Sequence, residues 1–218
     1  MLRLVCLLSL AAAAALVVRR LVLRVDTLGR PRDVPVVGVS VALVVALASG
    51  IPVLRHARLE HRLADVASTL AGRAVTVRCE TLTQAWTDAH PEAGYVWFDA
   101  AGRPASEATI TAATSDDLRG WVGSDHLAPT PAEVVAVHAL THEAMHLAGH
   151  LDEAVAECAA VQRDARTATL LGATDAQGSA LAGTYWRQVY GRLPDAYRTT
   201  DCAPGGRLDE RLPTPPWA

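Results

Sequence analysis

Two apolar stretches open the chain, and the pattern of hydrophobic and polar positions changes after residue 54. Val34–Leu54 is a run of 21 residues without a charge. At about 1.5 Å per residue, a helix of this length covers the roughly 30 Å hydrocarbon core of a bilayer. The earlier stretch Leu4–Val18 is shorter and ends at a pair of arginines. We therefore predict a transmembrane helix over residues 34–54, preceded by a short apolar segment and an Arg-rich loop over residues 1–33.

The next part of the chain passes from helical periodicity to short strand-like runs. Apolar positions in Arg55–Ala71 recur at helical spacing, which predicts an amphipathic helix that Gly72 ends. Runs with β-branched and aromatic residues follow, and they predict strands at Ala74–Cys79, Tyr95–Asp99 and Thr109–Ala113. This region is therefore expected to form a small sheet.

Helical patterns replace the strands beyond residue 130. Thr130 and Glu133 have the spacing of a capping box, with a proline at the first helical position, and they predict a helix that runs to Leu147. Two further helices are expected over residues 152–171 and 176–190, because glycines and prolines punctuate the apolar pattern there. The chain is thus predicted to be largely helical from residue 130 to residue 190, and the proline-rich remainder is expected to form an extended tail.

This order of elements predicts an α+β fold class. N-terminal transmembrane helices lead into one domain over residues 55–218, in which a short β-sheet precedes the active-site helix and further helices. The 164 residues of this domain suit a single unit with its own hydrophobic core.

Charge divides the chain at the same place. Residues 1–54 carry six Arg and two Asp and have a net charge of +4, whereas residues 55–218 carry 14 Arg and 21 acidic residues and have a net charge of −7. The total of −3 leaves no basic excess, so nucleic acid is excluded as a partner.

The distribution of arginine also predicts an orientation in the membrane. Five arginines lie between the two apolar stretches, and three follow the second stretch before residue 63. Because positive residues favour the cytoplasmic side, we expect the loop to be cytoplasmic and the domain to be extracytoplasmic at the cell membrane. A first stretch cleaved as a signal peptide would place the domain on the opposite side. A true start of the chain after residue 33 would leave one anchor and the same outward domain.

The chemistry that stands out is the pattern HExxH, formed by His142, Glu143 and His146 within the predicted helix. Four residues on a helix turn through about 400°, so both imidazoles project from one face within reach of a single ion. Glu143, rotated by about 100°, can then lie beside a metal-bound water. Two neutral imidazoles and a carboxylate suit Zn²⁺, with the fourth position open to water. We therefore predict the two histidines as zinc ligands and Glu143 as the catalytic general base.

The third ligand has four nearby candidates: His150, Asp152, Glu153 and Glu157. An unbroken helix beyond the motif would place Glu153 about 10 Å further along the axis than His146, too far to share an ion. A carboxylate ligand therefore requires the chain to fold back, and Gly149 suits the end of a helix.

One resemblance favours Asp152 as the ligand. The segment HEAMHLAGHLD fits a variant of the metzincin pattern, in which an aspartate follows the helix as third ligand. Metzincins also place a methionine turn after the motif. The two methionines of this chain, Met1 and Met145, do not lie there, so this interpretation lacks its second requirement.

A second resemblance favours Glu153. The segment DEAVAE, Asp152–Glu157, resembles the (N/D)-E-x-x-x-(D/E) segment of gluzincins, the thermolysin-like branch of zinc peptidases. This resemblance implies Glu153 as the third zinc ligand and Glu157 as the partner of the outer nitrogen of His142. The longer segment THEAMHLAGHLDEAVAEC is similar to that of small membrane-anchored zincins of GC-rich bacteria.

The gluzincin resemblance implies a membrane-anchored zinc metallopeptidase that acts on a peptide or protein substrate. A zinc-activated water would attack the peptide bond, with Glu143 as general base. A catalytically inactive zincin-like domain, anchored as a binding or scaffold module, is the alternative. The intact Glu143 favours the enzyme, because a scaffold needs no general base between its two histidines.

Other residues have possible roles around such a centre. An oxyanion would need a donor outside the motif, and the candidates are Tyr185, Tyr190, Tyr197 and His126. An edge strand that holds the substrate backbone could come from Tyr95–Asp99 or from Trp121–Leu127. His138, one turn before His142, is expected to be structural, although it could line the cleft.

Cysteine usage permits one disulfide in the domain. Cys79, Cys158 and Cys202 lie there, and Cys6 belongs to the first apolar stretch. Three cysteines allow one bridge with one thiol left over, and the sequence does not choose the pair.

Overall fold

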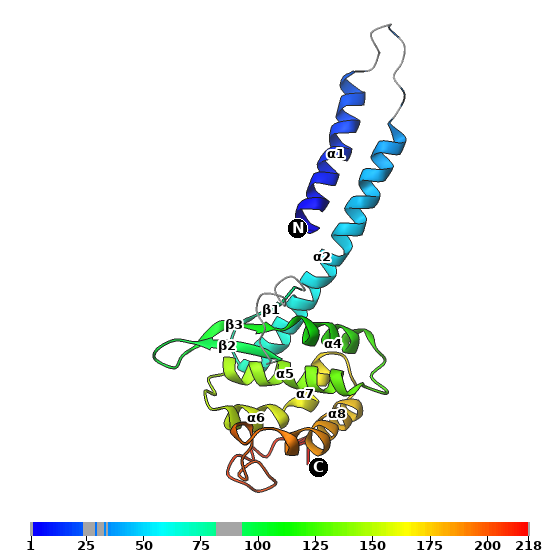
Figure 1. The fold of residues 1–218 in the computed structure, drawn as a ribbon. Coiled ribbons are helices and arrows are strands. Elements are labelled where there is room, and N and C mark those ends of the chain that lie inside the picture. The colour runs from blue at the N-terminus through cyan, green and yellow to red at the C-terminus, as the bar shows by residue number, and fades with distance from the viewer. Residues whose placement is uncertain (1, 24–28, 30–32, 34, 82–92, 218) are drawn as a thin grey trace. The chain divides into compact units, whose positions relative to one another are not determined.

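Two apolar helices, a three-stranded sheet and five further α-helices make up the part of the chain that is described by the computed structural model, residues 2–23, 29, 33, 35–81 and 93–217 (Figure 1). The chain divides into two compact units, Met1–Arg58 and Leu59–Ala218. The predicted α+β class is confirmed.

The first unit contains helix α1 (Leu2–Val22) and the start of helix α2 (Val36–Ala71). Both helices are long enough and apolar enough to cross a membrane. The apolar run and the amphipathic helix expected from the sequence are parts of this one helix α2, which includes Pro52. Gly50 and Pro52 lie just before the junction of the two patterns, but the helix continues through both. The predicted Arg-rich loop lies mostly outside the described residues.

The sheet of the second unit has the order β1-β3-β2. Its strands are β1 (Thr76–Cys79), β2 (Gly94–Phe98) and β3 (Pro104–Ile110). The central strand β3 pairs with β1 in parallel and with β2 in antiparallel orientation. Strand β2 therefore lies at one edge of the sheet.

The strand expected at Thr109–Ala113 is present, but it lies earlier in the chain than predicted. Strand β3 ends at Ile110, and helix α4 (Ala112–Gly123) follows directly. The sequence of β3, PASEATI, has little strand propensity, and the segment becomes a strand because it pairs on both sides. An edge strand at Trp121–Leu127 is contradicted, since the Trp121 side chain is completely buried within α4.

The helical part beyond residue 130 contains six elements. They are α5 (Pro131–Leu147), α6 (Glu153–Val161), α7 (Asp164–Leu170), α8 (Asp175–Gln188) and two short 3₁₀ turns, η1 (Tyr190–Arg192) and η2 (Asp195–Tyr197). The predicted capping box of α5 is confirmed, because the Thr130 side chain accepts from the backbone of Glu133 and the Glu133 side chain accepts from the backbone of Thr130.

The single helix expected over residues 152–171 is wrong, because the chain breaks between α6 and α7 at Gln162 and Arg163. The side chain of Gln162 binds the backbone of the C-terminal segment at Leu208 and Glu210. Neither residue at the break is a glycine or proline. Contacts with a distant segment accompany this break, and a local pattern could not reveal them.

Helix α5 is the centre of the second unit. It packs against β2, β3 and α4 on one side and against α6, α7 and α8 on the other (Figure 1). Thirteen of its 17 residues are buried, which leaves no exposed stripe along most of its length. Leu140 and Leu147 of α5 and Trp121 of α4 are fully buried apolar side chains of one hydrophobic core. The sheet and the helices therefore hold α5 firmly in place.

A disulfide joins Cys158 of α6 to Cys202 of the C-terminal segment, and Cys6 and Cys79 are free. Arg163 adds a bidentate ion pair with Glu210 beside it. The pair left open by the sequence is thus assigned, and the C-terminal segment is tied to α6.

We expect Cys202→Ser to lower the free energy of unfolding by about 2–4 kcal/mol, because the lost bridge closes a long loop in the unfolded chain. Urea unfolding of the full chain in detergent, followed by tryptophan fluorescence, measures this change. Cys6→Ser is the matched control and should leave the midpoint unchanged. Peptide mapping without reductant should recover Cys158 linked to Cys202, and a linkage through Cys79 would contradict the assignment.

Candidate metal centre

Helix α5 brings His142 and His146 together in its buried C-terminal half. Their Nε2 atoms lie 2.9 Å apart, and the two rings meet nearly edge to face. Both side chains are less than one tenth exposed, as is that of Glu143 between them. The four-residue spacing on one helix accounts for this contact, as the HExxH pattern predicts.

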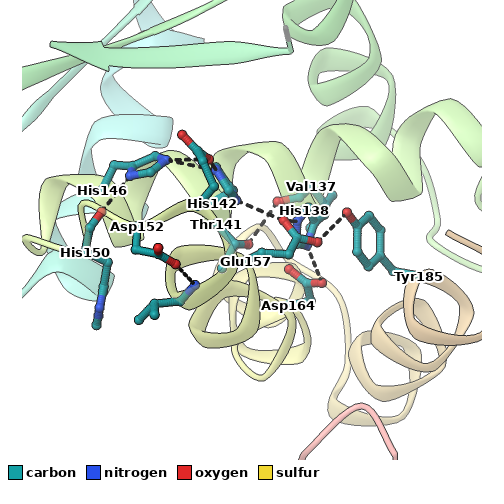
Figure 2. A network of polar contacts seen from close by, with 12 residues as sticks. Val137, His138, Thr141, His142, His146, His150, Asp152, Glu157, Asp164 and Tyr185 are labelled. Carbon is teal, nitrogen blue, oxygen red and sulfur yellow. Dashed lines mark hydrogen bonds and ion pairs between the residues drawn. The ribbon is translucent and has the colours of Figure 1, made fainter. Parts of the chain in front are cut away.

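The chain reverses directly after α5, as the sequence requires for a carboxylate ligand. Gly149 has a φ of +106°, a conformation that favours glycine, and the backbone N–H of His150 donates to Met145. Asp152 then caps α6 by accepting from the backbone N–H of Val155 (Figure 2). The reversal lays α6 back along α5.

Glu153, the first residue of α6, completes a group of three candidate ligands. Its Oε2 lies 3.1 Å from Nε2 of His142 and 3.3 Å from Nε2 of His146. Its side chain is two-fifths exposed, so the group is open on one side. These three residues could hold a metal ion.

The other candidates for the third ligand have different roles. Oδ1 of Asp152 caps α6 by accepting from the backbone N–H of Val155, and Asp152 is not among the residues whose ligand atoms converge with those of His142 and His146. His150 uses its backbone carbonyl to accept a hydrogen bond from Nδ1 of His146, at 2.7 Å. Oε2 of Glu157 contacts Nδ1 of His142 at 3.0 Å, on the side of the ring away from Glu153.

The hydrogen bonds at the two Nδ1 atoms determine which nitrogen of each neutral ring carries the proton, and therefore whether Nε2 has a lone pair for a metal ion. A carbonyl oxygen can only accept, so Nδ1 of His146 must carry the proton. Nδ1 of His142 likewise donates to the carboxylate of Glu157. In the neutral rings, both Nε2 atoms then direct a lone pair toward the other and toward Glu153.

A metal ion fits this set of donors. One proton on His142 can satisfy one of the three close contacts, whereas a divalent cation satisfies all of them at once. Ligands at about 2.0–2.2 Å in a tetrahedron lie roughly 3.3 Å apart, and the observed separations of 2.9, 3.1 and 3.3 Å are close to that value.

Proton affinities differ sharply between the two histidines. Burial lowers the pKa of His142, but hydrogen bonds to Glu153 and Glu157 outweigh it and raise the pKa to about 9. Burial and the neighbouring His142 lower the pKa of His146. The carboxylate of Glu153 has a lowered pKa because His142 donates to it. Near neutral pH the three candidate ligand atoms therefore share one proton, carried by Nε2 of His142, and this proton competes with a metal ion.

His138 belongs to the same network, which sequence reasoning missed. Its Nε2 lies 3.0 Å from Oε2 of Glu157, and its Nδ1 lies 2.9 Å from Oδ2 of Asp164 (Figure 2). Burial lowers the pKa of His138, but the two carboxylates outweigh it and raise the pKa to about 10. The signal in the sequence was the interval of four residues between His138 and His142.

The four oxyanion-donor candidates separate in space. Tyr185 donates its hydroxyl to Oε1 of Glu157 inside the network, and the hydroxyl of Tyr190 donates to the backbone carbonyl of Thr199. His126 packs against Trp121. The ring of Tyr197, on η2, lies 6.0 Å from that of His142. Tyr197 is thus the candidate that the structure brings beside the metal group.

The edge strand β2 lies against the motif. The ring of Phe98 meets that of His146 edge-on at 5.7 Å. Gly94 packs so closely that an added Cβ would lie 3.0 Å from Cγ of Glu143 and 2.9 Å from the carbonyl oxygen of Thr109. The expected strand around Tyr95–Asp99 therefore borders the candidate site.

Comparison with protein-family models, with curated proteins and with solved structures finds no match. The geometry of the site therefore carries the functional argument.

We expect Glu153→Gln to weaken the binding of Zn²⁺, used as the probe ion, by more than about 100-fold, because an amide is a much poorer ligand than a carboxylate. Asp152→Asn is the matched control, since asparagine caps a helix as well as aspartate, and its zinc affinity should stay within about threefold of wild type. Competition with a chromogenic chelator measures both affinities. The reverse result would identify Asp152 as the ligand.

Proposed function

We propose that this protein is a membrane-anchored zinc metallopeptidase with a gluzincin-like site. The observation that carries the proposal is the convergence of His142, His146 and Glu153 beside Glu143. His142 and His146 each present Nε2 to one point, and their Nδ1 atoms are fixed by Glu157 and a backbone carbonyl. This matches the need of a zinc site for oriented neutral imidazoles.

The donor set favours zinc over harder cations. Two imidazoles and one carboxylate are common ligands of catalytic zinc, whereas Mg²⁺ and Ca²⁺ prefer oxygen ligands throughout. When bound, zinc supplies a Lewis acid that makes water acidic and polarises a carbonyl group. Three protein ligands leave a coordination position for the reaction.

The residues of the chain have distinct roles in this proposal. Glu143 is nine-tenths buried beside the ligands, where it can take a proton from the attacking water and pass it to the leaving amine. The edge strand β2 offers backbone groups to an extended peptide, as in strand addition. Tyr197 is the donor for the carbonyl oxygen, because its ring lies next to His142.

Membrane anchoring is supported by α1 and α2. Large apolar side chains along both helices are exposed, with Leu7 at 64% and Val37 at 77%, as expected for residues that face lipid. A soluble core helix would bury such residues. The disulfide between Cys158 and Cys202 favours an oxidising compartment, in agreement with an extracytoplasmic domain.

We expect Glu143→Gln to lower peptide hydrolysis by about 10²- to 10⁴-fold, because the amide cannot accept the proton. Zinc content should remain one ion per chain, since Glu143 is not a ligand. Hydrolysis of casein and of a mixed peptide library by the full chain in detergent, together with elemental analysis, measures both quantities. The exposed Glu107→Gln is the control and should keep wild-type activity.

Two outcomes would contradict this function. A wild-type chain that holds no zinc would exclude the metal site. A chain that holds zinc but cleaves nothing in the library, with identical results for the Glu143 variant, would favour the inactive binding or scaffold module.

The close approach of Gly94 to Glu143 generates a further prediction. In Gly94→Ala, the added methyl must displace Glu143 or shift β2 from Thr109, and we expect kcat to fall by about tenfold or more. Zinc content should be unchanged. Gly123→Ala is the matched control, because a Cβ at Gly123 meets no atom within 4 Å. Equal activities of the two variants would show that β2 does not set the position of Glu143.

A further inference from the structure

The candidate metal group is one end of a longer row of alternating histidines and carboxylates. Helix α5 contributes a histidine at every fourth position, and α6 contributes glutamates at the same interval. Because α5 and α6 run in opposite directions, the histidines of α5 alternate with the glutamates of α6. The last member of the row, Asp164, lies on α7 (Figure 2). The row consists of His146, Glu153, His142, Glu157, His138 and Asp164.

Glu157 is held from three directions within this row. Its Oε2 accepts from Nδ1 of His142 and from Nε2 of His138, both at 3.0 Å. Its Oε1 accepts from the hydroxyl of Tyr185 at 2.9 Å. With only 2% of its surface exposed, Glu157 has no room for water to replace these donors.

The side chain of His138 is fixed as tightly as that of Glu157, which it contacts. Both of its ring nitrogens contact carboxylates, and Asp164 on its far side is completely buried. The ring stacks on Tyr185 with centroids 3.6 Å apart and planes inclined by 14°. His138 therefore cannot turn without breaking two charged hydrogen bonds and this stack.

A purely structural role does not account for these residues. Well-packed apolar side chains of similar volume stabilise a core as well as buried charged groups do, or better, because charged groups lose their hydration. The row retains ionisable side chains and ends on a candidate metal ligand. The orientation of that ligand is the property that the row can control.

We propose that His138 and Asp164 are positioning residues for the metal site. They hold Glu157 against Nδ1 of His142 and thereby keep Nε2 of His142 directed at Glu153 and His146. The inference rests on the proposed function, since it assigns these residues to the zinc centre. It extends the support of His142 by two residues, from Glu157 through His138 to Asp164.

The test compares zinc affinity in three variants of the full chain in detergent. His138→Phe keeps a ring against Tyr185 but has neither nitrogen, and zinc binding should weaken by about 10- to 100-fold. In His138→Gln the side-chain amide can donate to Glu157 in place of Nε2, so the affinity should recover to within about threefold of wild type. Asp164→Asn keeps the volume but loses the charge, and we expect about tenfold weaker binding.

A spectroscopic readout separates positioning from stability. The visible absorption of Co²⁺ bound in place of zinc should change in His138→Phe and return in His138→Gln. Ser115→Ala is the matched control. It removes the hydrogen bond of a buried hydroxyl group on α4, and Ser115 is distant in the sequence from the residues of the row. Circular dichroism in the presence of a chelator establishes which metal-free variants fold.

The outcomes distinguish this inference from the proposed function. If His138→Phe folds and binds zinc within about threefold of wild type, with an unchanged Co²⁺ spectrum, the inference is overturned while the zinc peptidase stands. If His138→Phe does not fold, wild-type affinity in Asp164→Asn overturns it instead. A wild-type chain without zinc affinity would remove both proposals.

Discussion

The return of α6 along α5 is the constraint on which the site depends. A straight continuation of α5 would carry Glu153 away from the two histidines, because each residue adds about 1.5 Å along the axis. Gly149 ends the helix in a conformation that favours glycine, and Asp152 starts the next helix three residues later. This short connection leaves little freedom in the angle between the helices. The register between α5 and α6 is then fixed by the alternating contacts of histidines with glutamates.

Burial strengthens the contacts between the histidines and the carboxylates, but it also removes the charged groups from water, which costs free energy. Glu157 and Asp164 are almost completely excluded from water, and the shared His138 lies between them. With His138 as an imidazolium, His142 neutral as a metal ligand and the carboxylates of Glu153, Glu157 and Asp164 ionised, the side chains of the row would carry a net charge of −2. A divalent cation at the proposed site would bring the row to neutrality. The need for charge balance in a region of low dielectric and the convergence of lone pairs thus both favour a bound cation at this site.

The sheet restricts the space on the side of α5 that faces strand β2. Strand β2 is close enough to the motif that a glycine is needed at position 94, and Phe98 lies against the ring of His146. Glu143 is therefore confined between the strand and the ligands. The same confinement that buries the carboxylate also restricts its rotamers, which agrees with the proposed role of Glu143 as general base.

Local signals in the sequence were sufficient for α5 and its motif. The capping box of Thr130 and Glu133, the helical period and the spacing of His142 and His146 depend only on neighbouring residues, and the structure contains each of these features. The contact of Glu157 with His142 followed from a resemblance and is present. The reversal at Gly149 followed from geometry, because no unbroken helix could bring a third ligand close.

Structural features that depend on contacts with distant segments could not be predicted from local sequence patterns. Strand β3 has small and polar residues and forms because β1 and β2 pair with it, so it was placed too late in the chain. The break between α6 and α7 coincides with contacts of Gln162 to the C-terminal segment. The local pattern predicts a structural role for His138, and it cannot reveal the partner Asp164, which lies 26 residues away. In each case the deciding partner is close only after folding.

The disulfide between Cys158 and Cys202 has a consequence for the integrity of the folded chain. It closes a covalent ring that includes α7, α8 and both 3₁₀ turns, and the ring begins at the residue next to Glu157. A backbone cut at any point inside the ring leaves two pieces that remain linked. Tyr185, His142 and Tyr197 would therefore stay in one covalent molecule after such a nick. A cut by a protease inside the ring would therefore not release the segment that carries Tyr197.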